Sequence, residues 1–384
     1  MTRILKYSVE QSLEDAANHL KRGGLVAFPT ETVYGLGADA RSPKAVRSIY
    51  EVKRRPATDP LIVHVPSVAF AEEMIHPTQT TPWQRKTLRA LAEAFWPGPL
   101  TMILPAHPNN IAFEVTSGTG LVGLRLPEHP LAQKFLDLCQ LPVAAPSANL
   151  FGHVSPTTAE HVLVDFPDVD NLWILDGGQC GFGIESTVVR LNENESLEIL
   201  RRGGVGPKQL AEVLLQSGLC KSGSGAVRVL ERFVAESSTD AQAAPGQLLI
   251  HYAPRIPAHM VSLGSPSEKI AFHMSVSDEE LKQTVVLDFG TQLNALCERV
   301  GFYRNLALNG DSKLAAYSLF EALRWAENCV PESGQVWIFD PRAVSDQNDE
   351  LFLALQDRVV RATSGRSSVL HVTPDSGPIY VSTR

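Results

Sequence analysis

Cationic and small polar side chains follow several of the apolar runs that we expect to form buried strands. The cations are Lys53, Arg55, Arg125 and Arg201, and the hydroxyls and amides are Thr30, Thr32, Ser147, Asn149, Ser155 and Ser186. This set lacks an obvious nucleophile or general base. It favours a reaction in which the protein positions phosphates and carboxylates and stabilises developing charge, as in phosphoryl or nucleotidyl transfer.

Several common catalytic and metal-binding motifs do not occur in the sequence. There is no Gly-x-x-x-x-Gly-Lys-Ser/Thr phosphate loop, no dinucleotide fingerprint, no His-Glu-x-x-His and no Gly-x-Ser-x-Gly. The five cysteines lie far apart, without a Cys-x-x-Cys pair. We therefore expect no protein-bound metal site and, because this cysteine usage suits a reducing compartment, a cytoplasmic protein.

One stretch is expected to position much of this chemistry. Leu25–Phe28 is long enough for one buried strand, and Pro29–Gly37 is interpreted as a turn rich in hydroxyls and glycine. Ser42-Pro43 is typical of a helix start, and that helix should present Lys53–Arg55 at its end, before a second buried strand at Leu61–Val65. Each piece alone has an ordinary structural explanation. Their combination within about one βαβ unit favours a ligand site.

Length and composition predict two α/β domains. A chain of 384 residues exceeds the size at which single cores stop growing. Strands alternate with helices, and closely spaced strands around 184–200 indicate a mixed sheet. We expect a mixed open sheet with flanking helices in 1–216, a linker rich in Ser, Gly, Ala and Thr in 217–255, and a smaller Rossmann-like α/β domain in 256–384.

The charge balance limits the partners. The net charge of −8 argues against stable nucleic-acid binding, because proteins that grip a phosphate backbone usually carry a basic face. Local positive charge in an acidic protein fits a small polyanionic substrate better. No apolar run approaches the roughly 18 residues of a membrane span, so we expect no membrane association.

A series of linked motifs resembles the YrdC-type threonylcarbamoyl-AMP synthases. In the first domain the motifs are KRGGLVAFPTETVYGLGADA, KRRPATDPLIVHV, WPGPLT, GLRLP, APSANLFGHVSPT, GIESTVV and ILRRGG, which span roughly residues 10–215 in the order of that family. PGQLLIHYAP in the linker and DRVVRA near the C-terminus resemble the two-domain form. The resemblance implies a YrdC-like first domain.

The resemblance also implies a reaction. Members of this family join L-threonine, bicarbonate or carbon dioxide, and ATP into threonylcarbamoyl-AMP, with release of pyrophosphate. ATP is then a substrate, expected to carry Mg²⁺. The product would pass to a threonylcarbamoyl-transferase complex that modifies the adenosine beside the anticodon of ANN-decoding tRNAs.

The family motifs assign roles to individual residues. The resemblance implies that Lys53 and Arg55 are catalytic and that ATP is bound by Lys53, Arg55, Ser147, Asn149, Ser155, Arg201 and Tyr252. It implies that threonine is bound by Thr32, His64, Arg125 and Ser186. His251 and Tyr252, in the linker, are implied to form a lid over the site.

Some alternatives stay open at this point. His64 alternates within an apolar strand and could be a core histidine. Asp59 stands where this family commonly has asparagine, which puts a contact to ATP at this position in doubt. An RNA-binding module and another carbamoyl-transfer enzyme of the YrdC-like group are the competing functions.

Overall fold

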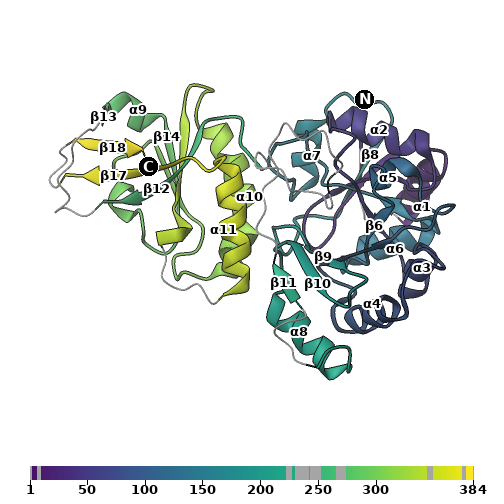
Figure 1. Cartoon of the computed structure of the whole chain (residues 1–384). Coiled ribbons are helices and arrows are strands. Elements are labelled where there is room, and N and C mark those ends of the chain that lie inside the picture. Colours follow the sequence, from purple (N-terminus) through teal and green to yellow (C-terminus); the bar gives the residue numbers. More distant parts are fainter. Residues whose placement is uncertain are drawn as a thin grey trace. The chain divides into compact units, whose positions relative to one another are not determined.

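The computed structural model of the chain describes residues 2–6, 10–221, 227–229, 242, 252–264, 274–343, 349–373 and 378–383. The chain divides into two compact units (Figure 1). The first unit contains Met1–Phe151 and Ser155–Leu248, and the second contains Gly152–Val154 and Leu249–Arg384.

The first unit is built on a mixed sheet of eleven strands in the order β1-β8-β2-β3-β7-β4-β6-β5-β9-β10-β11. The sheet contains both parallel pairs, such as β4 with β6, and antiparallel pairs, such as β2 with β3. The strands are β1 (Arg3–Lys6), β2 (Leu25–Phe28), β3 (Gly35–Asp39), β4 (Ile62–His64), β5 (Leu100–Pro105), β6 (Leu121–Arg125), β7 (Val143–Ala144), β8 (Leu172–Asp176), β9 (Thr187–Leu191), β10 (Leu197–Arg201) and β11 (Val227–Val229).

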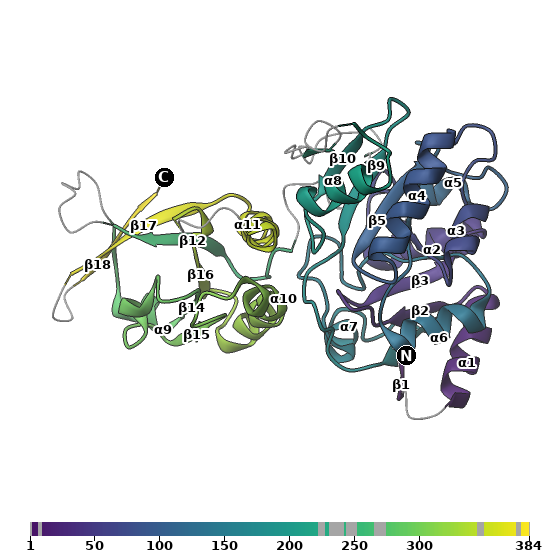
Figure 2. The ribbon, with the colours of Figure 1, turned by 90° about the horizontal axis from the view of Figure 1, so that it is seen from below.

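Helices cover both faces of this sheet (Figure 2). Alternate residues of β2 show this, because Leu25 and Ala27 pack in one hydrophobic cluster while Val26 and Phe28 pack in another. The first cluster is closed by α2, α4, α7 and α8, and the second by α1 and α6. The helices are α1 (Glu10–Lys21), α2 (Pro43–Lys53), α3 (Val68–Glu73), α4 (Pro82–Phe95), α5 (Phe113–Thr116), α6 (Pro130–Cys139), α7 (Ala159–Asp165) and α8 (Pro207–Gln216).

The predicted α/β class and mixed sheet are confirmed, and one local interpretation was wrong. The expected turn Pro29–Gly37 is shorter, because Gly35 already begins β3. As a result β2 and β4 are not neighbours, since β3 and β7 lie between them.

The second unit contains a seven-stranded sheet in the order β13-β18-β17-β12-β16-β14-β15. The strands from β17 to β15 are parallel, and β18 and β13 are antiparallel to their neighbours. The long helices α10 and α11 pack against each other and approach β14 and β12. A Rossmann-like fold for this unit stays a prediction. Its elements are β12 (Ala258–Leu263), β13 (Met274–Val276), α9 (Asp278–Lys282), β14 (Thr284–Asp288), η1 (Asn294–Leu296), β15 (Phe302–Asn305), α10 (Ser312–Cys329), β16 (Gln335–Phe339), η2 (Pro341–Ala343), α11 (Glu350–Ala362), β17 (Ser367–Val372) and β18 (Ile379–Thr383).

The described residues 217–221, 227–229 and 242 of the expected linker range lie in the first unit. Strand β11 pairs in parallel with β10, and the backbone N–H of Gln242 donates to the carbonyl of Thr58 at 2.9 Å. The domain boundaries proposed from the sequence stay predictions. No helix in the described part of the chain combines the length and apolar character needed to cross a membrane.

Candidate active site

The C-terminal end of α2 buries two of the predicted cationic side chains, Lys53 and Arg55. The helix is capped at its N-terminus by Ser42, whose Oγ accepts the N–H of Ala45, and at its C-terminus by Arg54, which adopts a left-handed conformation with φ of 55°. This reversal directs the chain back, so that Lys53 and Arg55 are 1% and 7% exposed. Arginine and lysine are rarely buried this deeply without partners, so each must be stabilised locally.

The ammonium group of Lys53 holds the segment that follows β7. Its Nζ donates to the carbonyl of Ser147 at 2.6 Å and to the carbonyl of Asn149 at 2.5 Å. Burial and then the charge of Arg55 lower the pKa of Lys53 well below its usual value. The structure therefore brings the Lys-x-Arg and Ser-x-Asn motifs together. Asn149 is fully buried and Ser147 is half-buried.

Arg55 is surrounded by the loop that leads into β4. Its Nε donates to the carbonyl of Asp59 at 3.1 Å, and its Nη2 donates to the carbonyl of Pro60 at 2.9 Å. The same Nη2 lies 2.9 Å from the carboxylate of Asp59. The residue that departs from the family pattern is thus an ion-pair partner of a predicted catalytic residue.

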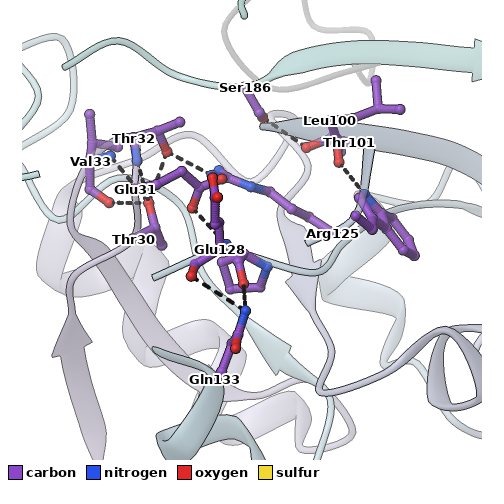
Figure 3. A network of polar contacts seen from close by, with 12 residues as sticks. Thr30, Glu31, Thr32, Val33, Leu100, Thr101, Arg125, Glu128, Gln133 and Ser186 are labelled. Carbon is purple, nitrogen blue, oxygen red and sulfur yellow. Dashed lines mark hydrogen bonds and ion pairs between the residues drawn. The ribbon is translucent and has the colours of Figure 1, made fainter. Parts of the chain in front are cut away.

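Two of the residues expected to bind L-threonine, Thr32 and Arg125, belong to a second polar cluster (Figure 3). The Nη2 of Arg125 donates to Glu31 Oε1 at 2.7 Å and to Thr32 Oγ1 at 2.9 Å. Thr32 also hydrogen-bonds Thr30, and Glu31 Oε2 accepts the backbone N–H of Glu128. The Nε–H of Arg125 is buried and has no hydrogen-bond partner among the described residues. A buried donor without a protein partner is satisfied by an ordered water or by a bound ligand, and a guanidinium favours an anionic one.

His64 lies beside Arg125, because the two residues are register partners at the ends of the parallel strands β4 and β6. Burial and, next, the positive charge of Arg125 lower the pKa of His64 to about 3, so the imidazole is neutral near pH 7. Its ring meets Phe28 edge-on, with ring centroids 5.7 Å apart. Its Nδ1 has no hydrogen-bond partner in the described part of the protein. Both the core interpretation and the threonine-binding interpretation are compatible with these contacts.

Ser186 and Arg201 are held together at the start of β9 and the end of β10. The guanidinium of Arg201 donates to the carbonyl and to the Oγ of Ser186, both at 3.1 Å. Ser186 Oγ is also 2.8 Å from the hydroxyl of Thr101 on β5, as Figure 3 shows. Arg201 is therefore a direct neighbour of a residue expected in the threonine set, although the motif assigned it to ATP.

The short strand β4 connects the two clusters. The Arg55–Asp59 loop precedes it and His64 is its last residue, so a strand of three residues, about 7–10 Å long, separates them. This spacing allows a nucleotide and an amino acid to lie next to each other on one sheet.

Three residues that hydrogen-bond the predicted site residues were not themselves predicted. Glu31 accepts from Arg125, Glu185 Oε1 accepts from the hydroxyl of Ser155 at 2.6 Å, and Thr101 contacts Ser186. All three lie inside quoted motifs, namely PTET, GIEST and WPGPLT. Their position inside these motifs could have marked them as candidate site residues, but only the contacts show which side chain each one meets.

The expected lid residues are described only in part. His251 lies outside the described residues. Tyr252 belongs to the second unit, where it is fully buried, stacks on Phe320 with ring centroids 5.2 Å apart, and has the guanidinium of Arg358 5.2 Å above its ring. Packing accounts for these contacts, and a contact of Tyr252 with ATP stays a prediction.

No group of three or more His, Cys, Asp or Glu side chains in the described ranges could hold a metal ion. One carboxylate near the nucleotide set, Asp59, is already paired with Arg55. The described side chains thus do not form a metal site of their own.

Comparisons with known proteins identify relatives of the chain. A family model described as "Telomere recombination" matches residues 18–203, and one described as "Threonylcarbamoyl-AMP synthase, C-terminal domain" matches residues 205–364. The chain is 35% identical over 358 residues to a threonylcarbamoyl-AMP synthase of Bacillus subtilis, covering 93% of this chain and 94% of that protein. It is 39% identical over 261 residues to one of Pyrococcus abyssi, covering 68% and 70%.

Solved structures show the same relationship. The crystal structure of the P. abyssi protein Sua5 in complex with L-threonine matches with a TM-score of 0.76 and 31% identity, covering 97% of this chain and all of that one. A doubly substituted form of the same protein matches equally well. With both family models in order and a relative at 35% identity over nearly the whole length, the chain belongs to the threonylcarbamoyl-AMP synthase family, in its two-domain form.

Proposed function

We propose that the first unit of this chain acts as a nucleotidyltransferase that forms L-threonylcarbamoyl-AMP from L-threonine, bicarbonate or carbon dioxide, and ATP, and releases pyrophosphate. The observation that carries the proposal is Arg125, a buried guanidinium whose Nε–H has no partner in the described residues and whose Nη2 is held by Glu31 and Thr32. Such a group is prepared to receive a carboxylate.

Threonine would bind in the cluster around Arg125. Its carboxylate would accept from the guanidinium, and its side-chain hydroxyl would lie among the hydroxyls of Thr32 and Ser186 and the neutral imidazole of His64. The neutral state of His64 supports this arrangement, because a neutral ring can accept a hydrogen bond as well as donate one. A relative in the family has been crystallised with L-threonine.

ATP would bind in the cluster at the other end of β4. Lys53 and Arg55 would face its phosphates, while Ser147 and Asn149, held by Lys53, and Ser155, held by Glu185, would contact the nucleotide. ATP is proposed to enter as its Mg²⁺ complex, so the metal would come with the substrate.

The chemistry requires little acid–base machinery. The amine of threonine adds to carbon dioxide and loses a proton, which gives a carbamate. A carbamate oxygen then attacks the α-phosphorus of ATP, and the bond from that phosphorus to the bridging oxygen breaks as pyrophosphate leaves. Charge builds up on the leaving phosphates, where buried cations stabilise it.

The test is an incubation of the purified full-length chain with ATP, bicarbonate and threonine, with pyrophosphate and threonylcarbamoyl-AMP measured together. Each substrate is omitted in turn. Pyrophosphate formed without threonine would indicate a different reaction. Transfer of the product to ANN-decoding tRNA by a threonylcarbamoyl-transferase complex belongs to the same proposal and is tested by adding that complex.

A further inference from the structure

The loop between α2 and β4 contains a deeply buried ion pair. The side chains of Arg55 and Asp59 are 3% and 0% exposed, and Arg55 Nη2 lies 2.9 Å from Asp59 Oδ1. The backbone of the same loop accepts two further hydrogen bonds from this guanidinium, through the carbonyls of Asp59 and Pro60. Arg55 is therefore fixed by its own loop before any ligand arrives.

The carboxylate of Asp59 acts on both cations of the proposed nucleotide set. Burial and the charge of Arg55 disfavour the protonated ammonium of Lys53, whereas Asp165 and Asp59 favour it. Two adjacent buried cations repel each other and are costly to desolvate, so a buried negative charge beside them stabilises the protein without nucleotide. The same charge repels any phosphate that approaches the cations.

We propose that Asp59 is an internal counter-ion that weakens the binding of phosphate chains at Lys53 and Arg55 and so promotes the release of pyrophosphate. This inference rests on the proposed function, because it assumes that nucleotide phosphates meet these two cations. Phosphates and Asp59 compete for the same positive charge. The carboxylate thus lowers the affinity for ATP and for pyrophosphate by a similar factor.

The alternative explanation is that the Arg55–Asp59 ion pair only stabilises the conformation of the loop. The backbone N–H of Asp59 donates to the carbonyl of Pro56, as in a β-turn, and the backbone N–H of Gln242 donates to the carbonyl of Thr58 in the same loop. If shape alone mattered, loss of the carboxylate would affect ligands regardless of their charge. A series of ligands with the same base and sugar but different charge separates the two explanations.

The experiment measures the binding of adenosine, AMP, ADP, ATP and pyrophosphate to the full chain by calorimetry at fixed salt and Mg²⁺. Wild type is compared with Asp59→Asn, which keeps the size and an acceptor oxygen, and with Asp59→Glu, which keeps the charge. Asp39→Asn is the matched control. It removes one negative charge from the same unit, at the ion pair with the exposed Arg41.

Asp59→Asn is expected to bind ATP and pyrophosphate about tenfold more tightly, the order of magnitude for removing one charge about 10 Å away at an effective dielectric constant of about 20. Adenosine affinity should stay unchanged, and AMP and ADP should lie between. Asp59→Glu and Asp39→Asn should bind like wild type. The melting temperature of Asp59→Asn should fall without ligand and recover more than wild type on adding ATP.

Unchanged ATP affinity in Asp59→Asn, or an equal change for adenosine and ATP, would overturn the inference while leaving the proposed function intact. Wild-type protein that binds no ATP would overturn both. If Asp59→Asn is too unstable to purify, Asp59→Ser is prepared in the presence of ATP and measured with the same ligands. Unchanged ATP affinity, or an equal change for adenosine and ATP, would again overturn the inference.

Discussion

At the scale of single residues, Arg125 has three kinds of neighbour. One nitrogen donates to the carboxylate of Glu31 and to the hydroxyl of Thr32, another has no partner in the described residues, and His64 lies beside it on the next strand. A lysine at this position would keep the charge but would lose the rigid, planar fork that lets one nitrogen contact Glu31 and Thr32 while another faces a bound carboxylate.

Arg125→Lys is therefore expected to lower the affinity for threonine at least about tenfold, in line with the loss of a well-aligned charge-assisted hydrogen bond, and to change ATP affinity much less. Calorimetric titrations with each ligand give the two constants. Equal losses for threonine and ATP would mean that Arg125 supports the fold of the whole site.

His64 gives a prediction for stability. Its pKa of about 3 in the folded protein lies below the value of about 6.5 expected when unfolded. As the pH falls below 6.5, the unfolded chain takes up a proton that the folded chain does not. The free energy of unfolding must then fall by up to about 1.4 kcal/mol per pH unit.

Between pH 7 and pH 5, wild type should consequently lose about 2 kcal/mol more stability than His64→Gln, which has no group that titrates there. Urea unfolding of both proteins at the two pH values measures the difference. Parallel losses would show that His64 is accessible to protons in the folded state.

At the scale of elements, the end of α2 links two motifs that are about 90 residues apart. Lys53 Nζ donates to the carbonyls of Ser147 and Asn149, so the helix end fixes the segment after β7. Changing Lys53 therefore affects the position of that segment as well as the charge near the phosphates.

Lys53→Ala and Arg55→Ala are each expected to reduce formation of threonylcarbamoyl-AMP at least about tenfold, since charge-stabilising groups of this kind contribute a few kcal/mol. Lys53→Ala should also lower the melting temperature, because it removes the donor to the carbonyls of Ser147 and Asn149. Lys44→Ala, at an exposed position of the same helix, is the control and should be close to wild type. Near-normal turnover in both site variants would remove Lys53 and Arg55 from the proposed site.

At the scale of the whole molecule, the ring of Tyr252 packs inside the second unit. It stacks on Phe320 and lies under Arg358, with no exposed surface. Tyr252→Ala should cost about 3–5 kcal/mol of stability, the usual range for removing a large buried side chain, whereas Tyr252→Phe should keep the melting temperature.

The two variants also test the expected contact with ATP. If the hydroxyl of Tyr252 binds the nucleotide, Tyr252→Phe must lower ATP affinity at unchanged melting temperature. If affinity is unchanged, Tyr252 is a packing residue only. His251→Ala, measured beside them for net threonylcarbamoyl-AMP, tests whether the linker protects the product.

The sequence by itself determined the family, the α/β class and the positions of many elements. Motifs such as Lys53-x-Arg55 and Ser147-x-Asn149 could be read locally, because proline, glycine and capping residues fix where helices end and strands begin. The helix over Pro43–Lys53 and the strand Leu25–Phe28 were predicted for these reasons and are present.

Tertiary structure decided which side chains meet. Pairing of β4 with β6 places His64 beside Arg125, and the intervening strands β3 and β7 separate β2 from β4, which periodicity along the chain could not show. The partners of the cations, Asp59 for Arg55 and Glu31 for Arg125, likewise follow from contacts and burial. The physical reason is that the energy of a charge depends on its distance to other charges and to water, and the sequence does not contain those distances.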